Sequence, residues 1–304
     1  MKLTPGKLHT GFILSALVLV TAATAPINAQ NRAPVAIPPV HQLAASADTR
    51  TLGERALDVD RTLAVDIGSR PAGSEAEHRA AAFLAQQFIE MGYATDVVPF
   101  DYTTSGGGSG TSQNVVAHSW SEDTGAPLVV VGAHYDSVPA GPGANDNGSG
   151  TSTMVEVARA LSGDPPGSVA VRFVAFGAEE IGLKGSAAYV RSLSIRDRHR
   201  IALAISLDML AVGDEAQFAG SDPWRDAAIA MAVDRGYDAR DATDELRGLS
   251  DHQSFLDADI PAVLFHAESD PAYHTARDVI ERVQPDYMGL MGDIAIALIR
   301  SAAG

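Results

Sequence analysis

The 304-residue chain contains no cysteine, and aromatic residues make up only 6% of it. Without cysteine it can form neither a disulfide framework nor a thiolate metal site, so any bound metal must have nitrogen and oxygen ligands. Basic residues are also scarce, because 22 Lys and Arg face 38 Asp and Glu, which gives a formal charge of −16. This balance argues against nucleic acid and anionic membranes as partners and is typical of an acidic surface. The hydrophobic fraction of 46% is sufficient for a sizeable core.

The N-terminus has the features of a targeting segment. Lys2 and Lys7 form a positively charged region that precedes an apolar stretch at residues 11–23. This stretch has the length expected of a signal peptide, but it is shorter than the about 20 residues of a membrane span. We expect cleavage before Gln30, an Ala/Pro-rich linker at residues 30–47 and one globular domain at residues 48–304. The product would be exported to the periplasm or the medium, without stable membrane insertion. An uncleaved N-terminal anchor is the alternative.

Helical and strand patterns alternate along the globular part. Helices are expected at residues 52–67, 76–91, 148–161, 187–193, 226–235, 250–256 and 285–302, and strands at 95–102, 115–118, 128–133, 169–176, 201–207 and 262–265. Ser74 and Glu77 predict a capping box at the start of the second helix. The glycine-rich residues 105–112 predict a hairpin loop, because no strand and helix flank them as in a phosphate loop. The alternation predicts a three-layer α/β/α fold with a mostly parallel central sheet.

Polar residues follow three of the predicted strands at their carboxyl ends. His134 comes after residues 128–133, Glu179 and Glu180 come after residues 169–176, and Asp208 follows residues 201–207. In open α/β sheets, ligands bind beyond the carboxyl ends of the strands. One acid at a strand end is usually a cap or a turn residue, whereas three such ends predict a site.

The first of these segments could form half of a metal site. Asp136 lies two residues after His134, on the same face of an extended chain, where its carboxylate can accept the second imidazole N–H. Asp146, in a Gly/Asn loop, is either an Asx turn or helix cap, or a ligand that the glycines allow close to a metal. Glu179 and Glu180 are adjacent and point apart, so they can serve one site only in different roles, one binding metal and one reaching a bound water.

The remaining candidates are weaker when each is taken alone. Asp208 lies in an apolar segment without a basic neighbour in sequence, and a buried carboxylate needs a partner. His274 follows no strong apolar run and by itself would be a surface residue. The contiguous Ser250, Asp251 and His252 cannot converge as a catalytic triad, and no nucleophile elbow is present.

Five segments in order resemble the motifs of the M28 family of co-catalytic zinc metallopeptidases, and the resemblance spans roughly residues 50–300. They are HYDS at 134–137, GANDNGSG at 143–150, GAEEIGLKGS at 177–186, LDM at 207–209 and YHT at 273–275. The resemblance implies a zinc exopeptidase-like fold with one catalytic domain.

The same resemblance assigns a role to each site residue. It implies that two zinc ions are bound by five ligands, His134, Asp146, Glu180, Asp208 and His274, with Asp146 bridging. Glu179 takes the position of the general base, Asp136 supports His134, and Tyr273 helps to hold the tetrahedral oxygen. Three carboxylates and two neutral imidazoles without thiolate are typical of a catalytic zinc site.

The resemblance implies an aminopeptidase that acts on peptides with a free N-terminus, and an acidic rim favours a substrate ammonium. Carboxypeptidases and glutaminyl cyclases of the same fold are alternatives, as is a metal-binding or protein-binding module without catalysis. The two-zinc family M20 is excluded, because only 66 positions separate Asp208 from His274, too few for its inserted domain. The SDHQSF segment at residues 250–255, which includes Asp251 and His252, resembles a family stretch near the substrate pocket and could line it. Asp278 could brace His274 or be an acid at a helix start, and Arg247 could contact substrate or be a solvated surface residue.

Overall fold

The computed structural model describes residues 48–119, 125–267 and 270–302. The predicted signal peptide and linker lie outside the described residues. No helix in the described part of the chain has the length and hydropathy needed to cross a membrane.

One mixed sheet of eight strands forms the centre of the described domain, in the order β1-β2-β4-β3-β5-β8-β6-β7. The strands are β1 Ala94–Thr103, β2 Ser109–His118, β3 Leu128–His134, β4 Ala170–Phe176, β5 Ile201–Leu207, β6 Glu215–Gly220, β7 Asp238–Asp241 and β8 Ala262–Ala267. The four central strands β4, β3, β5 and β8 are parallel to one another. The hairpin β1–β2 and strand β6 join this block in antiparallel fashion. The α/β fold with a parallel centre is confirmed.

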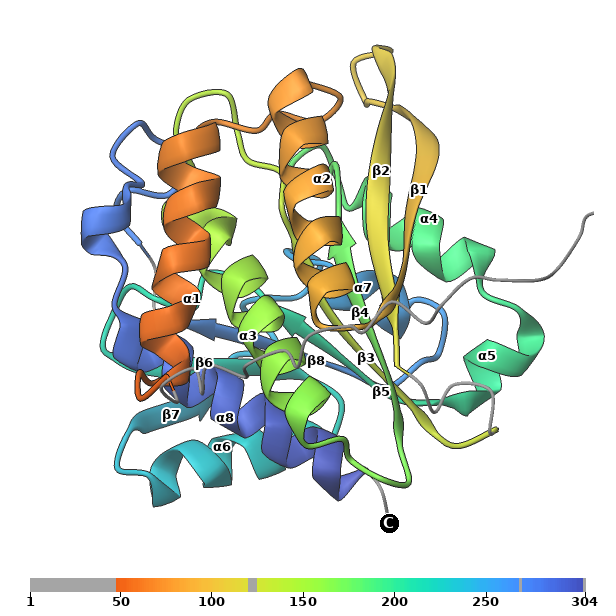
Figure 1. Cartoon of the computed structure of the whole chain (residues 1–304), viewed down its shortest axis with the longest axis vertical. Coiled ribbons are helices and arrows are strands. Elements are labelled where there is room, and N and C mark those ends of the chain that lie inside the picture. The colour runs from red at the N-terminus through yellow and green to blue at the C-terminus, as the bar shows by residue number, and fades with distance from the viewer. Residues whose placement is uncertain (1–47, 120–124, 268–269, 303–304) are drawn as a thin grey trace, which may run out of the picture. The chain divides into compact units, whose positions relative to one another are not determined.

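Helices cover both faces of the sheet. They are α1 Leu52–Arg61, α2 Glu75–Glu90, α3 Gly150–Gly163, α4 Lys184–Ser192, α5 Ile195–Arg200, α6 Trp224–Asp234, α7 His252–Leu256 and α8 Pro285–Ser301, with irregular turns η1 Thr62–Ile67, η3 Ala144–Ser149 and η4 Ile280–Arg282. Helices α1, α2, α3 and α8 lie on the near side of the sheet in Figure 1, and α4 and α7 lie behind it. The three layers follow from this arrangement.

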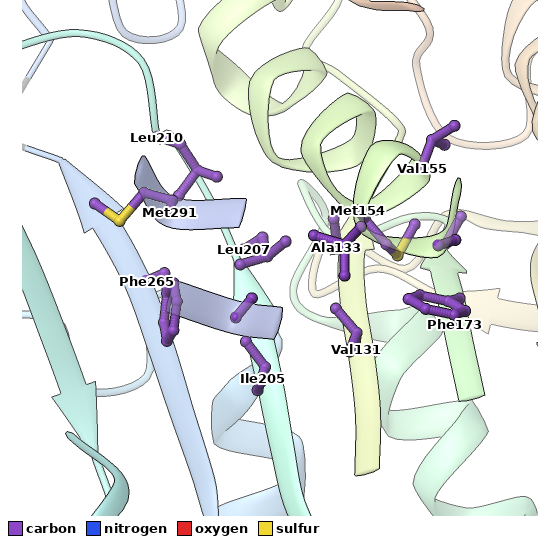
Figure 2. Packing of buried hydrophobic residues seen from close by; sticks show 14 of the residues in the cluster. Val131, Ala133, Met154, Val155, Phe173, Ile205, Leu207, Leu210, Phe265 and Met291 are labelled. Carbon is purple, nitrogen blue, oxygen red and sulfur yellow. The ribbon is translucent and has the colours of Figure 1, made fainter. Parts of the chain in front are cut away.

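The two central strands β3 and β4 are buried along their whole length. Their continuous apolar sequences are typical of parallel strands that are covered on both faces. On one face Met154 of α3 packs over Val131 and Phe173 (Figure 2). On the other face Phe176 contacts Tyr189 of α4, with ring centroids 5.9 Å apart. This packing fixes the carboxyl ends of the strands, where the predicted site lies.

The starts of the first two helices differ from each other in their caps. Thr51 and Glu54 form a complete capping box before α1. Ser74 accepts the Glu77 N–H before α2, as predicted, but the reciprocal half of that box is wrong. The Glu77 carboxylate instead accepts the Gly73 N–H at 2.6 Å and the Ser112 hydroxyl at 2.5 Å. Glu77 therefore ties the start of α2 to Ser112 of β2.

Strands β6 and β7 and helix α5 were not predicted from the sequence, and strand β2 was predicted too short. Strand β7 has the charged sequence DARD, and α5 buries none of its residues, so neither carries an apolar period. Strand β6 also lacked a prediction. The glycine-rich stretch expected as a loop is narrower, because β2 begins at Ser109 and pairs with β1 as far as Thr103.

Candidate metal centre

Three strand ends deliver their polar residues to one edge of the sheet. His134 is the last residue of β3, and its imidazole is almost completely buried. Its Nε2 lies 3.4 Å from Asp146 Oδ1, 3.5 Å from Asp208 Oδ1 and 3.9 Å from Glu179 Oε2. The structure therefore brings together polar residues at or just after the ends of β3, β4 and β5, together with Asp146 from η3.

His274 completes the cluster from a different part of the chain. Its Nε2 lies 2.8 Å from Glu180 Oε2 and 3.2 Å from Asp146 Oδ2. Its φ of +57° is in the left-handed region, which non-glycine residues adopt mainly where their surroundings hold them. His274 is partly exposed, whereas His134 is buried, so the cluster opens toward solvent on the His274 side.

The carboxylate of Asp146 faces an imidazole with each of its oxygens. This divides the cluster into two half-sites: His134, Asp146 and Asp208 form the first, and His274, Asp146 and Glu180 form the second. Candidate ligand atoms of Glu180 also lie within 4.8 Å of His134 and Asp146. The shorter contact with His274 places Glu180 in the second half-site.

The cluster has the properties of a cation site. Asp208 Oδ1 and Glu180 Oε1 are buried and accept no hydrogen bond from the described residues. Four carboxylates in one buried cluster repel each other without a compensating charge. Nitrogen and oxygen atoms about 2.0–2.2 Å from a tetrahedral zinc would be roughly 3.3–3.5 Å apart, similar to the spacing around His134. The residues therefore fit two divalent cations that share Asp146.

The electrostatics of the cluster reflect this crowding. Burial raises the pKa of Glu179 well above its usual value, and burial together with Asp146 raises the pKa of Glu180 to about 8. Burial also acts to raise the pKa of Asp146, but hydrogen bonds with His134 and His274 outweigh it and lower the pKa. Burial lowers the pKa of His134, yet the nearby Glu179 and Asp208 carboxylates raise it overall. Without metal, protons bound to these groups therefore offset part of the negative charge of the cluster.

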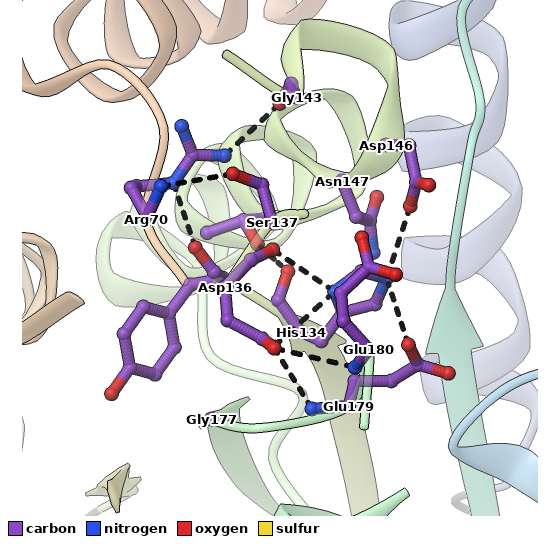
Figure 3. Close-up of polar contacts among 12 residues, drawn as sticks. Arg70, His134, Asp136, Ser137, Gly143, Asp146, Asn147, Gly177, Glu179 and Glu180 are labelled. Carbon is purple, nitrogen blue, oxygen red and sulfur yellow. Dashed lines mark hydrogen bonds and ion pairs between the residues drawn. The ribbon is translucent and has the colours of Figure 1, made fainter. Parts of the chain in front are cut away.

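Asp136 lies beside the Glu pair and holds it (Figure 3). Its Oδ1 accepts the Glu179 N–H at 3.0 Å, and its Oδ2 accepts the Glu180 N–H at 3.3 Å. His134 Nδ1 lies 3.3 Å from the backbone oxygen of Asp136 and 3.5 Å from its carboxylate. The predicted support of His134 therefore comes at least as much from the backbone of Asp136, while its carboxylate orients the Glu pair.

The loop that carries Asp146 is held by side chains that the sequence pattern did not reveal. Gly143 has φ +61°, and a Cβ there would lie 2.4 Å from the Asp146 carbonyl oxygen. Asn147 donates to the Leu207 carbonyl at 2.8 Å and accepts the Met209 N–H at 3.3 Å. This links the Asp146 loop to the end of β5 beside Asp208. The two asparagines of the GANDNGSG motif were the available signal for these contacts.

The Asp278 carboxylate holds the loop that carries Asp146. Its two oxygens accept the N–H groups of Asn145 at 2.7 Å and Asp146 at 3.0 Å. The sequence suggested that Asp278 braces His274 or acts as an acid at a helix start, and these contacts with the Asp146 loop were not foreseen.

A cavity of about 220 Å³ lies next to the cluster. Its apolar wall is formed by four side chains, Met209, Leu246, Leu249 and Leu264. Tyr273 also lines it, and its half-exposed ring stacks on His274 with centroids 3.7 Å apart. Asp208 of the first half-site and Glu180 of the second also line the cavity.

The SDHQSF segment, expected near the pocket, contributes only in part. Ser250 lines the cavity beside the cluster, and the Asp251 side chain is buried. His252 and Arg247 line a different cavity, and Arg247 pairs with Asp244 at 3.1 Å on the surface. The structure therefore gives Arg247 no contact with the metal cluster.

Comparison with known proteins identifies the chain by its family. The sequence model of peptidase family M28 matches residues 114–299, which contain every residue of the two half-sites. The chain belongs to peptidase family M28. Among curated proteins, this M28 chain is 38% identical over 208 residues to aminopeptidase YwaD of Bacillus subtilis, and 34% identical over 220 residues to the probable lipoprotein aminopeptidase LpqL of Mycobacterium tuberculosis.

Those alignments cover 63% and 60% of the M28 chain but only 45% and 43% of the two relatives, so the chain spans less than half of each. The solved structure of BSAP, a zinc aminopeptidase from Bacillus subtilis, has a TM-score of 0.75 at 23% identity. That match covers 82% of this chain and 95% of the neighbour, and it establishes the shared fold.

The buried acids predict how the stability of the metal-free protein depends on pH. Burial raises the pKa of Glu180 to about 8 and those of Glu77 and Asp251 to about 7. The folded chain then binds more protons than the unfolded chain, so the free energy of unfolding falls as pH rises. His252, with its pKa lowered by burial to about 4, opposes this only below about pH 6.5.

We therefore expect the melting temperature of the metal-free protein to fall between about pH 6.5 and 8, and added zinc to raise it most at pH 8, where the ligands are deprotonated. Calorimetry with and without zinc tests this. A metal-free melting temperature that rises over that range contradicts it.

Proposed function

We propose that the protein is an exported zinc-dependent aminopeptidase with two zinc ions per chain. The observation that carries the proposal is the Asp146 carboxylate, which faces His134 with one oxygen and His274 with the other. Such an arrangement suits a bridging ligand between two metals, and membership of family M28 supports the same assignment. Asp208 would complete the first half-site and Glu180 the second.

When bound, the two zinc ions would polarise the scissile carbonyl and lower the pKa of the attacking water toward about 7. Glu179 serves as the general base in this proposal. Its Oε2 is 3.9 Å from His134 Nε2, farther than the oxygens of Asp146 and Asp208, and its side chain lines the cavity. The carboxylate takes the proton of the attacking water and delivers it to the leaving amine.

In this proposal Tyr273 acts as a hydrogen-bond donor to the reacting substrate. Its ring is held against His274, and it lines the same cavity as Glu179. Burial, together with the nearby carboxylates, raises the pKa of its phenol, so the hydroxyl stays protonated. We propose that this hydroxyl donates to the oxygen of the tetrahedral species during hydrolysis.

Two features support removal of residues from the amino end of a peptide. The carboxylates that line the cavity favour a substrate ammonium over a substrate carboxylate. The wall of Met209 and three leucines favours an apolar first side chain. A carboxypeptidase binds a substrate carboxylate, which these acids disfavour, whereas a glutaminyl cyclase or a non-catalytic binding module of this fold is distinguished by the digest described below.

Export is the part of the proposal that depends on sequence alone. Lys2, Lys7 and the apolar residues 11–23 support a signal peptide that is cleaved before Gln30. The site of action would then be the periplasm or the medium.

A digest of a mixed peptide library, followed by mass spectrometry, tests the reaction. We expect stepwise loss of amino-terminal residues, fastest where the first residue is leucine, methionine or another apolar amino acid, and blocked by amino-terminal acetylation. Elemental analysis of the same sample should give about two zinc ions per chain. Trimming from the carboxyl end, formation of pyroglutamate, or no cleavage with zinc present would each contradict the aminopeptidase proposal.

Substitution of the adjacent glutamates separates their roles. Glu179→Gln should keep both zinc ions and lower kcat by roughly 10²–10⁴, because the proton acceptor is lost while the ligands remain. Glu180→Gln, the matched control, should lose zinc from the second half-site. Zinc loss in Glu179→Gln and not in Glu180→Gln would mean that the two roles are reversed.

A further inference from the structure

Arg70 is a fully buried arginine between η1 and α2 whose guanidinium donates hydrogen bonds to backbone carbonyl groups. Its guanidinium reaches five carbonyl oxygens at 2.6–3.0 Å, those of Leu63, Gly68, Tyr135, Pro142 and Gly143. Its backbone also exchanges hydrogen bonds with Ser137. An arginine so placed joins segments that are far apart in sequence.

Three of these carbonyls belong to the segments that carry metal ligands (Figure 3). Tyr135 lies between His134 and Asp136, and its carbonyl accepts from Arg70 Nε at 2.8 Å. Pro142 and Gly143 begin the loop that leads to Asp146, and their carbonyls accept at 2.6 and 3.0 Å. One planar side chain therefore sets the spacing between the end of β3 and the Asp146 loop.

Asp278 holds the same loop through its amide groups. Its carboxylate accepts the N–H groups of Asn145 and Asp146 themselves. The loop is thus held by a cation at its carbonyl side and by an anion at its amide side. Asp60 and Asp278 interact electrostatically with Arg70 and act to raise its pKa, against the lowering effect of its burial.

We infer that Arg70 and Asp278 are positioning residues for Asp146, so that together they set the affinity of both half-sites for metal. The inference rests on the proposed zinc centre. It follows from the contacts that neither residue reaches the reacting groups directly and that each acts on the segment bearing the shared ligand. Loss of either one therefore weakens both half-sites together, because Asp146 belongs to both.

A purely structural role of these two residues predicts a different experimental result. If Arg70 and Asp278 only stabilise the fold, their variants would melt at lower temperature but bind zinc as the wild type does once folded. Polar partners that orient metal ligands typically change metal affinity by about 10–100-fold when they are replaced. Zinc affinity measured on the folded protein therefore separates the two roles.

The test uses the full chain with the substitutions Arg70→Lys and Asp278→Asn. Lysine keeps the charge but has no planar fork to span five carbonyls, and asparagine keeps the shape but offers one carbonyl oxygen in place of two. Zinc affinity is measured by competition with a chelator, and the melting temperature of the metal-free protein is measured beside it. Arg172→Lys is the control, because Arg172 is also a buried arginine and donates to the Tyr189 hydroxyl of α4.

We expect both zinc equivalents to weaken together by about tenfold or more in each variant, with wild-type affinity in Arg172→Lys. If Arg70→Lys fails to fold, Asp278→Asn alone decides the outcome. Folded variants that bind both zinc ions as tightly as the wild type, or that weaken only one, overturn the inference and leave the proposed function intact. A wild type that binds no zinc overturns both.

Discussion

The arrangement of the whole site depends on one carboxylate that must face two imidazoles at once. Asp146 lies 3.4 Å from His134 through one oxygen and 3.2 Å from His274 through the other. These histidines are 140 positions apart in the chain, so the fold has to bring two distant segments to the two sides of a single side chain. Because Asp146 is nearly buried, its charge must be compensated there, and this requirement places strict limits on the loop that carries it.

The fold meets this requirement through the ends of its parallel strands. Strands β3, β4 and β5 end at one edge and deliver His134, the Glu pair and Asp208, while their apolar bodies are fixed by helices on both faces. Asp136 then orients the Glu pair through two backbone N–H groups. The cluster of acids is costly without cations, and burial raises the pKa values of both Glu179 and Glu180. In the proposed function, bound zinc would compensate the negative charge of these acids and make the cluster catalytic.

The sequence predicted what depends on strand periodicity and on ordered motifs. Polar residues after apolar strands located the cluster, since parallel strands share one carboxyl edge. His274 could be placed only through resemblance to a family, because no apolar run precedes it. Arg70 was missed because its partners are backbone carbonyls up to 73 residues away, and such contacts leave no local pattern. Strand β7 was missed because four largely charged residues carry no period of burial.

The most direct test of the shared carboxylate is the zinc content of three alanine variants, measured by elemental analysis on folded protein. The account predicts that Asp146→Ala loses both zinc ions, whereas Asp208→Ala and Glu180→Ala each lose about one. An Asp146→Ala protein that retains two zinc ions, or that loses only one as the other variants do, would contradict the assignment of Asp146 to both half-sites.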